Sequence, residues 1–115
     1  MITIIETPTF LADIKRCALT DEEHRALINH LAAYPLAGDV MQGTGGVRKL
    51  RIAGQGRGKS GAFRVVYYYH DQSMPLFALA MFAKNERANL SQAERNQLKR
   101  LVSQLVQAYK EKKRG

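Results

Sequence analysis

The sequence predicts an α+β fold in which helices pack on a small, antiparallel-dominated sheet. Two observations support this class. Runs of β-branched and aromatic residues alternate with a period of two, and two capping-box sequences each precede apolar residues at helical spacing. The predicted order is one strand, two helices, three consecutive strands and a final helix. An apolar fraction of 45% over 115 residues predicts a packed core and a single domain spanning residues 1–115.

The first half of the chain contains one strand and two helices in this interpretation. Residues 2–6 are a β-branched run that ends at Thr7-Pro8, which predicts an opening strand. Residues 9–17 are expected to form a short helix with Phe10 and Ile14 on one side. A capping box at Thr20 and Glu23 then begins a second helix that ends before Pro35. Its expected apolar face consists of Leu27, Ile28, Leu31 and Ala32.

The second half contains three strands and a long helix. After a loop at 43–46, residues 47–53 alternate, with Leu50 and Ile52 on one face and Lys49 and Arg51 on the other. A long hairpin loop at 54–61 leads to a strand at 62–70, which is rich in Val and Tyr, and the apolar run 76–83 is typical of a central strand. Ser91 and Glu94 form a second capping box. The helix that follows carries an apolar stripe of Leu98, Leu101, Val102, Leu105 and Tyr109.

The charge distribution is the main functional signal. The formal net charge is +8, and no acidic residue occurs between Asp39 and Asp71. This window contains seven of the nine glycines and six cations: Arg48, Lys49, Arg51, Arg57, Lys59 and Arg64. Clustered cations without internal counter-charges repel one another, and they are typical of proteins that bind phosphate-bearing polymers. A nucleic acid is therefore the first candidate ligand.

The strand phases divide these cations into groups. Lys49 and Arg51 share a strand face, and pairing across the hairpin can bring Arg64 to the same face. Arg57 and Lys59 are expected on the loop above it, and Lys84, at the end of the following strand, can complete the group. The alternative is a merely soluble basic surface, or one that a bound partner neutralises, and composition alone does not separate these possibilities.

Other motifs are weaker. Residues 53–60 resemble a relaxed P-loop, but a strand pattern follows where a phosphate-binding loop needs a helix, so nucleotide hydrolysis is not predicted. His24, His30 and His70 share no face and are interpreted as solvated surface residues without a metal. Cys17 is assigned to packing. No cofactor is predicted, and the absence of a signal-peptide pattern or a long apolar run predicts a cytoplasmic protein.

Several short motifs together resemble HigB-type toxins of the RelE/ParE superfamily, which belong to type II toxin–antitoxin systems. They are Gly38-Asp39, Gly43-Thr44-Gly45-Gly46, Arg48-Lys49, Arg51, Gly58-Lys59-Ser60-Gly61 and the strand from Arg64 to Tyr69. The resemblance covers nearly the whole chain. It implies a RelE-like β-α-α-β-β-β-α fold and a ribosome-dependent, metal-independent mRNA endonuclease that inhibits translation. The alternative that it leaves open is a ParE-like toxin, which inhibits DNA gyrase without cutting RNA.

The resemblance also implies roles for individual residues. Lys49, Arg51 and Arg64 match the family's basic catalytic positions, whereas Arg48, Arg57, Lys59 and Lys84 are expected to contact RNA. Lys49 is the candidate general base because neighbouring cations favour its neutral form. Asn89-Leu90-Ser91 stands where some relatives have a catalytic Tyr or His, so the identity of the base stays open.

The expected partners follow from the same resemblance. They are the ribosome with its mRNA and a cognate antitoxin, which is expected to be a helix-turn-helix protein encoded by the neighbouring gene. Operator DNA is expected to be bound only through the antitoxin, and no membrane is involved.

Overall fold

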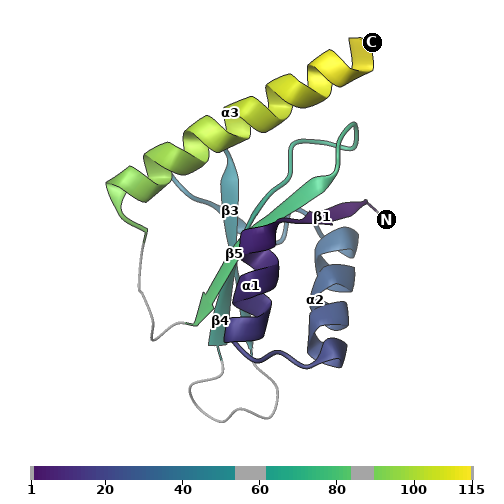
Figure 1. Cartoon of the computed structure of the whole chain (residues 1–115), viewed down its shortest axis with the longest axis vertical. Helices are drawn as coiled ribbons and strands as arrows, with labels where there is room; N and C mark the ends of the chain where they lie inside the picture. The colour runs from purple at the N-terminus through teal and green to yellow at the C-terminus, as the bar shows by residue number, and fades with distance from the viewer. Residues whose placement is uncertain (1, 54–61, 84–89, 115) are drawn as a thin grey trace.

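The computed structural model describes residues 2–53, 62–83 and 90–114 and confirms the α+β class (Figure 1). The elements in chain order are β1 (Ile4–Glu6), α1 (Pro8–Arg16), α2 (Asp21–Ala33), β2 (Asp39–Val40), β3 (Val47–Ala53), β4 (Ala62–Tyr68), β5 (Leu76–Ala83) and α3 (Gln92–Arg114). The predicted order of elements is therefore correct, with one strand added. That strand, β2, has two residues, too few for a periodic pattern to reveal it.

The five strands form one sheet in the order β1-β5-β4-β3-β2. Among these described strands, β1 pairs with β5 in parallel, and the pairings of β2 with β3, β3 with β4 and β4 with β5 are antiparallel. β4 ends at Tyr68 rather than at the predicted residue 70. The reason is a local turn, because the carboxylate of Asp71 accepts a hydrogen bond from the amide of Ser73 at 2.7 Å.

The helix starts follow the predicted capping chemistry. The Thr20–Glu23 capping box is present, and so is the second box, in which Ser91 and Glu94 exchange hydrogen bonds of 2.9 and 3.1 Å. α1 begins at Pro8, one residue before the predicted start, because the Thr7 hydroxyl caps it by accepting from the Phe10 amide. These caps fix where each helix meets the sheet.

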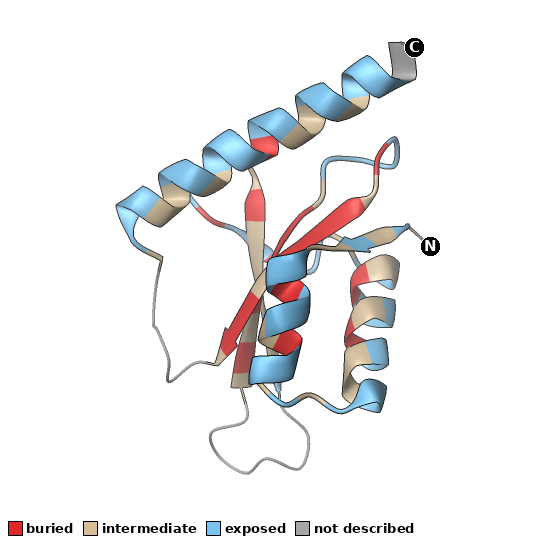
Figure 2. Cartoon of the chain, viewed as in Figure 1, coloured by how far each residue is buried: buried red, intermediate tan, exposed pale blue. Residues whose placement is uncertain are grey.

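The sheet separates two apolar clusters. α1 and α2 contribute Phe10, Ile14, Leu27 and Leu31 to the cluster on one face, and α3 lies on the other face (Figure 1). The apolar residues of α3 that pack there are Leu98, Val102, Leu105, Val106 and Tyr109. Leu101, which was assigned to this stripe, is 37% exposed. Of the α3 side chains that the structure describes, only Val102 is fully buried, so much of this helix is open to solvent (Figure 2).

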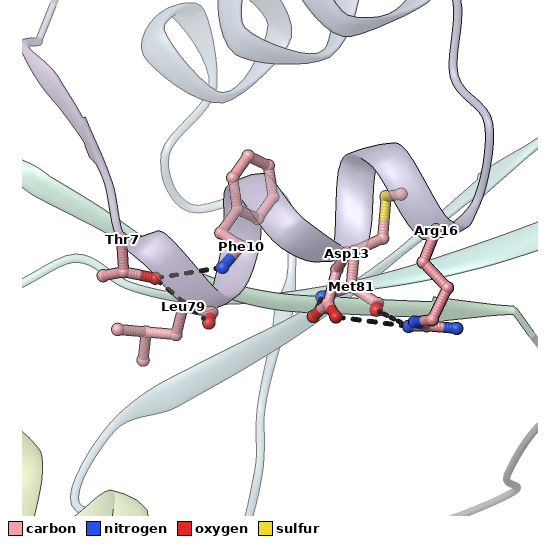
Figure 3. A network of polar contacts seen from close by, with 6 residues as sticks. All are labelled: Thr7, Phe10, Asp13, Arg16, Leu79 and Met81. Carbon is pink, nitrogen blue, oxygen red and sulfur yellow. Dashed lines mark hydrogen bonds and ion pairs between the residues drawn. The ribbon is translucent and has the colours of Figure 1, made fainter.

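Side chains of α1 cover the part of the β5 edge that β1 leaves unpaired (Figure 3). β1 pairs only with residues Leu76 to Ala78. Beyond that point the Met81 amide donates to Asp13 and the Met81 carbonyl accepts from Arg16, both at 2.9 Å. The Thr7 hydroxyl donates to the Ala78 carbonyl at 2.9 Å. The open edge is thereby closed to further strands, and α1 is fixed against β5.

Candidate functional site: a cation group on one face of the sheet

The strand register brings together the three residues that were predicted to be catalytic. Lys49 and Arg51 alternate on β3 and share a face, and Arg64 of β4 is paired directly with Arg51. Residues directly opposite in an antiparallel pair have Cβ atoms about 4.5–5.5 Å apart, and diagonal neighbours about 7–8 Å. Lys49 is paired with Val66, so it lies diagonal to Arg64. We call Lys49, Arg51 and Arg64 the cation group.

The cation group has no compensating contacts among the residues that the structure describes. Arg51 is exposed, and Arg64 is partly buried with its Nη1 atom shielded from solvent and without a hydrogen-bond partner. Like charges placed directly opposite each other destabilise a strand pair. A buried donor without an acceptor carries a further cost of about 1–3 kcal/mol. Such an arrangement is stabilised when an anion binds between the two guanidinium groups.

Arg48 lies on the opposite face of the sheet and does not join the cation group. It is paired with Val40 and Tyr67, and it shares its face with Leu50 and Ile52. Its Nη1 donates to the carbonyl oxygen of Gly38 at 2.7 Å, while its Nε is buried without a partner. Arg48 therefore holds the backbone before β2, and its expected contact with RNA stays a prediction.

Tyr67 holds the same piece of backbone from the neighbouring strand. Its hydroxyl accepts from the Gly38 amide at 2.8 Å and donates to the Pro35 carbonyl at 2.9 Å. Burial raises the pKa of Tyr67 above its ordinary value, and the Gly38 hydrogen bond and the charge of Arg48 partly offset this rise. Gly38 is required here, because a Cβ atom would lie 2.8 Å from the Tyr67 hydroxyl oxygen.

Other predicted site residues do not contribute to the described geometry. Arg57, Lys59, Lys84 and the P-loop-like stretch lie wholly or mainly outside the described residues. His24 contacts Glu6 of β1, which corrects its assignment as a solvated histidine, and His70 is hydrogen-bonded to Tyr68 at 3.0 Å. In residues 2–53, 62–83 and 90–114, no three His, Cys, Asp or Glu side chains gather as metal ligands. Across the same ranges, no helix has the length and apolarity to span a membrane.

The structure adds a carboxylate, Asp39, which bounds the window without acidic residues and belongs to the Gly38-Asp39 motif but was given no role from the sequence. Asp39 of β2 is paired directly with Lys49 of β3, so both side chains lie on the face of the cation group. Its neighbour Gly38 is the residue that Arg48 and Tyr67 hold. The available sequence signal was its position, ten residues before Lys49, but no pattern revealed the two-residue strand that carries it.

The fold and the site together define the class of protein: a small α+β domain that gathers three cations on one face of its sheet. Residues 4–114 match the model of a protein family described as the RelE toxin of the RelE/RelB toxin–antitoxin system. The chain belongs to this family of toxins. Toxins of this kind pair with a cognate antitoxin, and the excess of positive charge is consistent with an acidic partner surface.

Proposed function

We propose that this toxin is a ribosome-dependent, metal-independent mRNA endonuclease of the HigB type, and that it acts in the cytoplasm by blocking translation. The observation that carries the proposal is the direct pairing of Arg51 with Arg64, next to Lys49, with the Arg64 Nη1 buried and unpartnered in the described structure. This arrangement matches a phosphodiester, whose two non-bridging oxygens accept hydrogen bonds from paired guanidinium groups. Membership in the RelE family supports the same function.

The proposed reaction is an internal transfer within the RNA. The ribose 2′-oxygen attacks the adjacent phosphorus, and the bond to the 5′-oxygen of the next nucleotide breaks. The products are a 2′,3′-cyclic phosphate and a free 5′-hydroxyl. Negative charge gathers on the phosphoryl oxygens in the transition state, where Arg51 and Arg64 stabilise it. Removal of one such donor typically lowers the rate by about 10²–10³-fold.

The ribosome supplies the alignment that the cation group alone does not provide. The attacking oxygen must lie in line with the leaving oxygen, and correct orientation accounts for a large part of such rate enhancements. Arg51 is exposed, so the cation group does not enclose a single nucleotide. We therefore expect weak activity on free RNA. Arg57, Lys59 and Lys84 are proposed to contact RNA around the site.

The test is induction of the toxin in cells, followed by primer extension on cellular mRNA. Cuts in phase with codons are expected for the wild type, and the folded Arg64→Ala variant should give none and should permit growth. Purified ribosomes programmed with a short mRNA should give the same cuts with toxin that has been treated with EDTA and then freed of the chelator. Intact mRNA together with gyrase-linked DNA breaks would establish the ParE-like alternative instead.

The proposed antitoxin is a small protein that covers the cation group with an acidic or apolar segment. We expect it to be encoded beside the toxin gene and to carry the helix-turn-helix that binds operator DNA. Co-expression should restore growth and protect Arg51 and Arg64 from reagents that modify guanidinium groups. Restored growth without such protection would place the antitoxin elsewhere on the toxin.

A further inference from the structure

The face of the cation group contains one carboxylate whose position is set by the strand register. Asp39 of β2 is paired with Lys49 of β3 and lies diagonal to Arg51, which is also on β3. Asp39 and the three residues of the cation group therefore form a compact patch across β2, β3 and β4. The described strands contain one other carboxylate, that of Glu6 in β1, and it contacts His24 of α2. Asp39 is therefore the carboxylate that the described strands place within the cationic patch.

The backbone just before Asp39 is fixed by groups from two strands. The amide and the carbonyl of Gly38 are bound by the Tyr67 hydroxyl at 2.8 Å and by Arg48 Nη1 at 2.7 Å. Gly38 is buried, although Asp39 itself is exposed. Proteins usually orient a reacting side chain through hydrogen bonds of this kind, made by residues that do not touch the substrate themselves. They explain why a short edge strand occupies a defined position beside β3.

The Asp39 carboxylate is available to a ligand. Within the described parts of the chain it makes no ion pair, although Lys49 lies directly opposite. An exposed ion pair at this position would contribute at most about 1 kcal/mol to stability. Stability therefore does not account for the placement of Asp39, whereas proton transfer requires an accessible oxygen atom beside the phosphate-binding cations.

We propose that Asp39 is the general base of the RNA cleavage reaction, an inference that rests on the function proposed above. A carboxylate oxygen of Asp39 takes the proton of the ribose 2′-hydroxyl as the 2′-oxygen bonds to phosphorus. The bond from phosphorus to the 5′-oxygen breaks, and this leaving oxygen takes a proton from the ammonium group of Lys49. Transfer of a proton from Asp39 to Lys49 then restores both groups, so the protons balance over one turnover.

This assignment changes the role expected for Lys49 and gives Asp39 a role that the sequence did not predict. Lys49 was the candidate base expected from the sequence. The register places the carboxylate of Asp39 directly opposite Lys49, so the two groups can exchange a proton. Lys49 is then suited to donate a proton, and the carboxylate is suited to accept one.

The test compares Asp39→Asn with the wild type in a single-turnover assay on ribosomes that carry a short mRNA in the decoding site. Loss of a general base should slow cleavage by about 10²–10⁴-fold. Affinity for the ribosome should stay the same or increase, because the variant loses one negative charge. Asp21→Asn makes the same charge change at the exposed start of α2 and should cleave at the wild-type rate. Asp39→Glu should recover part of the activity.

Chemical rescue separates a base from a residue that only shapes the site. Formate added to folded, ribosome-bound Asp39→Ala should accelerate cleavage in proportion to its concentration and should leave Asp21→Ala unchanged. An active wild type with an equally active Asp39→Asn variant would overturn the assignment but leave the nuclease function intact. Failure of formate to accelerate the folded Asp39→Ala variant would also overturn it. A wild type that leaves programmed mRNA uncut would instead refute the proposed function itself.

Discussion

Two arginines on neighbouring strands, Arg48 and Arg64, show how the two faces of this sheet differ. Each side chain has one buried nitrogen without a hydrogen-bond partner in the described structure. Arg48 lies on the face covered by α1 and α2, and its other end donates to a backbone carbonyl at 2.7 Å. Arg64 lies on the α3 face, paired with Arg51 on one side and Phe82 on the other.

The comparison separates arginines that stabilise the fold from arginines that are available to a ligand. On the α1/α2 face, Arg48 and Tyr67 satisfy the backbone between α2 and β2, which apolar packing alone leaves without partners. On the α3 face, Arg51 and Arg64 repel each other and satisfy no such group among the described residues. A side chain that lowers stability without contributing to packing is a strong candidate for function.

The largest expected effect is that of Arg64→Met, which tests the α3 face. Cleavage on programmed ribosomes should fall by at least about 10²-fold, because a donor to the transition state is lost. The free energy of unfolding should stay the same or rise by up to about 1 kcal/mol, since the repulsion from Arg51 is removed. Single-turnover kinetics and urea unfolding of the same preparation measure both quantities.

A matched control for this prediction is Lys99→Met. Lys99 is an exposed cation on α3, beside Gly45, and it lies outside the cation group. The change removes the same charge, and cleavage should remain within a few-fold of the wild type. An equal loss in Arg64→Met and Lys99→Met would mean that total charge, rather than the paired arginines, drives cleavage.

The next largest effect is expected for Arg48→Met, in which the loss falls mainly on stability and less on cleavage. Loss of a charged hydrogen bond to the Gly38 carbonyl should lower the free energy of unfolding by about 1.5–3 kcal/mol. Cleavage should fall less than in Arg64→Met, because Arg48 acts only through the position of β2. Urea unfolding measures the change in stability, and the same kinetic assay measures the change in cleavage. A stable Arg48→Met variant with fully lost activity would return Arg48 to the RNA-contacting role first expected from the sequence.

The same pair of arginines shows which parts of the site could be predicted from the sequence and which could not. Period-two alternation correctly placed Lys49 and Arg51 on one face, and hairpin pairing correctly brought Arg64 to them. The same alternation already separates Arg48 from Lys49, yet the family resemblance grouped Arg48 with the loop cations as an RNA contact. Its carbonyl partner lies ten residues away in a connection without any periodic pattern. Asp39 was missed for the same reason, since a two-residue strand is defined only by its partner.

The smallest expected effect concerns two consecutive tyrosines that lie on opposite faces of β4. Tyr67 packs in the α1/α2 cluster and Tyr68 in the α3 cluster. Burial raises the pKa of both hydroxyls above the ordinary value of 10.0, and the charge of Asp71 adds to the rise at Tyr68. The folded state therefore favours the neutral phenols, so their contribution to stability is complete below pH 10 and is lost as the pH rises above it.

Tyr67→Phe and Tyr68→Phe should each reduce the loss of stability between pH 9 and pH 11, as measured by urea unfolding at several pH values. Each unit of pKa difference between the folded and unfolded states corresponds to about 1.4 kcal/mol. Tyr67→Phe should also lower stability at pH 7, because it removes the hydrogen bonds to Gly38 and Pro35. Among the described residues, Tyr68→Phe removes the single bond to His70. Tyr34→Phe, on an exposed ring, is the control. Equal losses at pH 7 for Tyr67→Phe and Tyr68→Phe would contradict the conclusion that the α1/α2 face holds the backbone before Asp39.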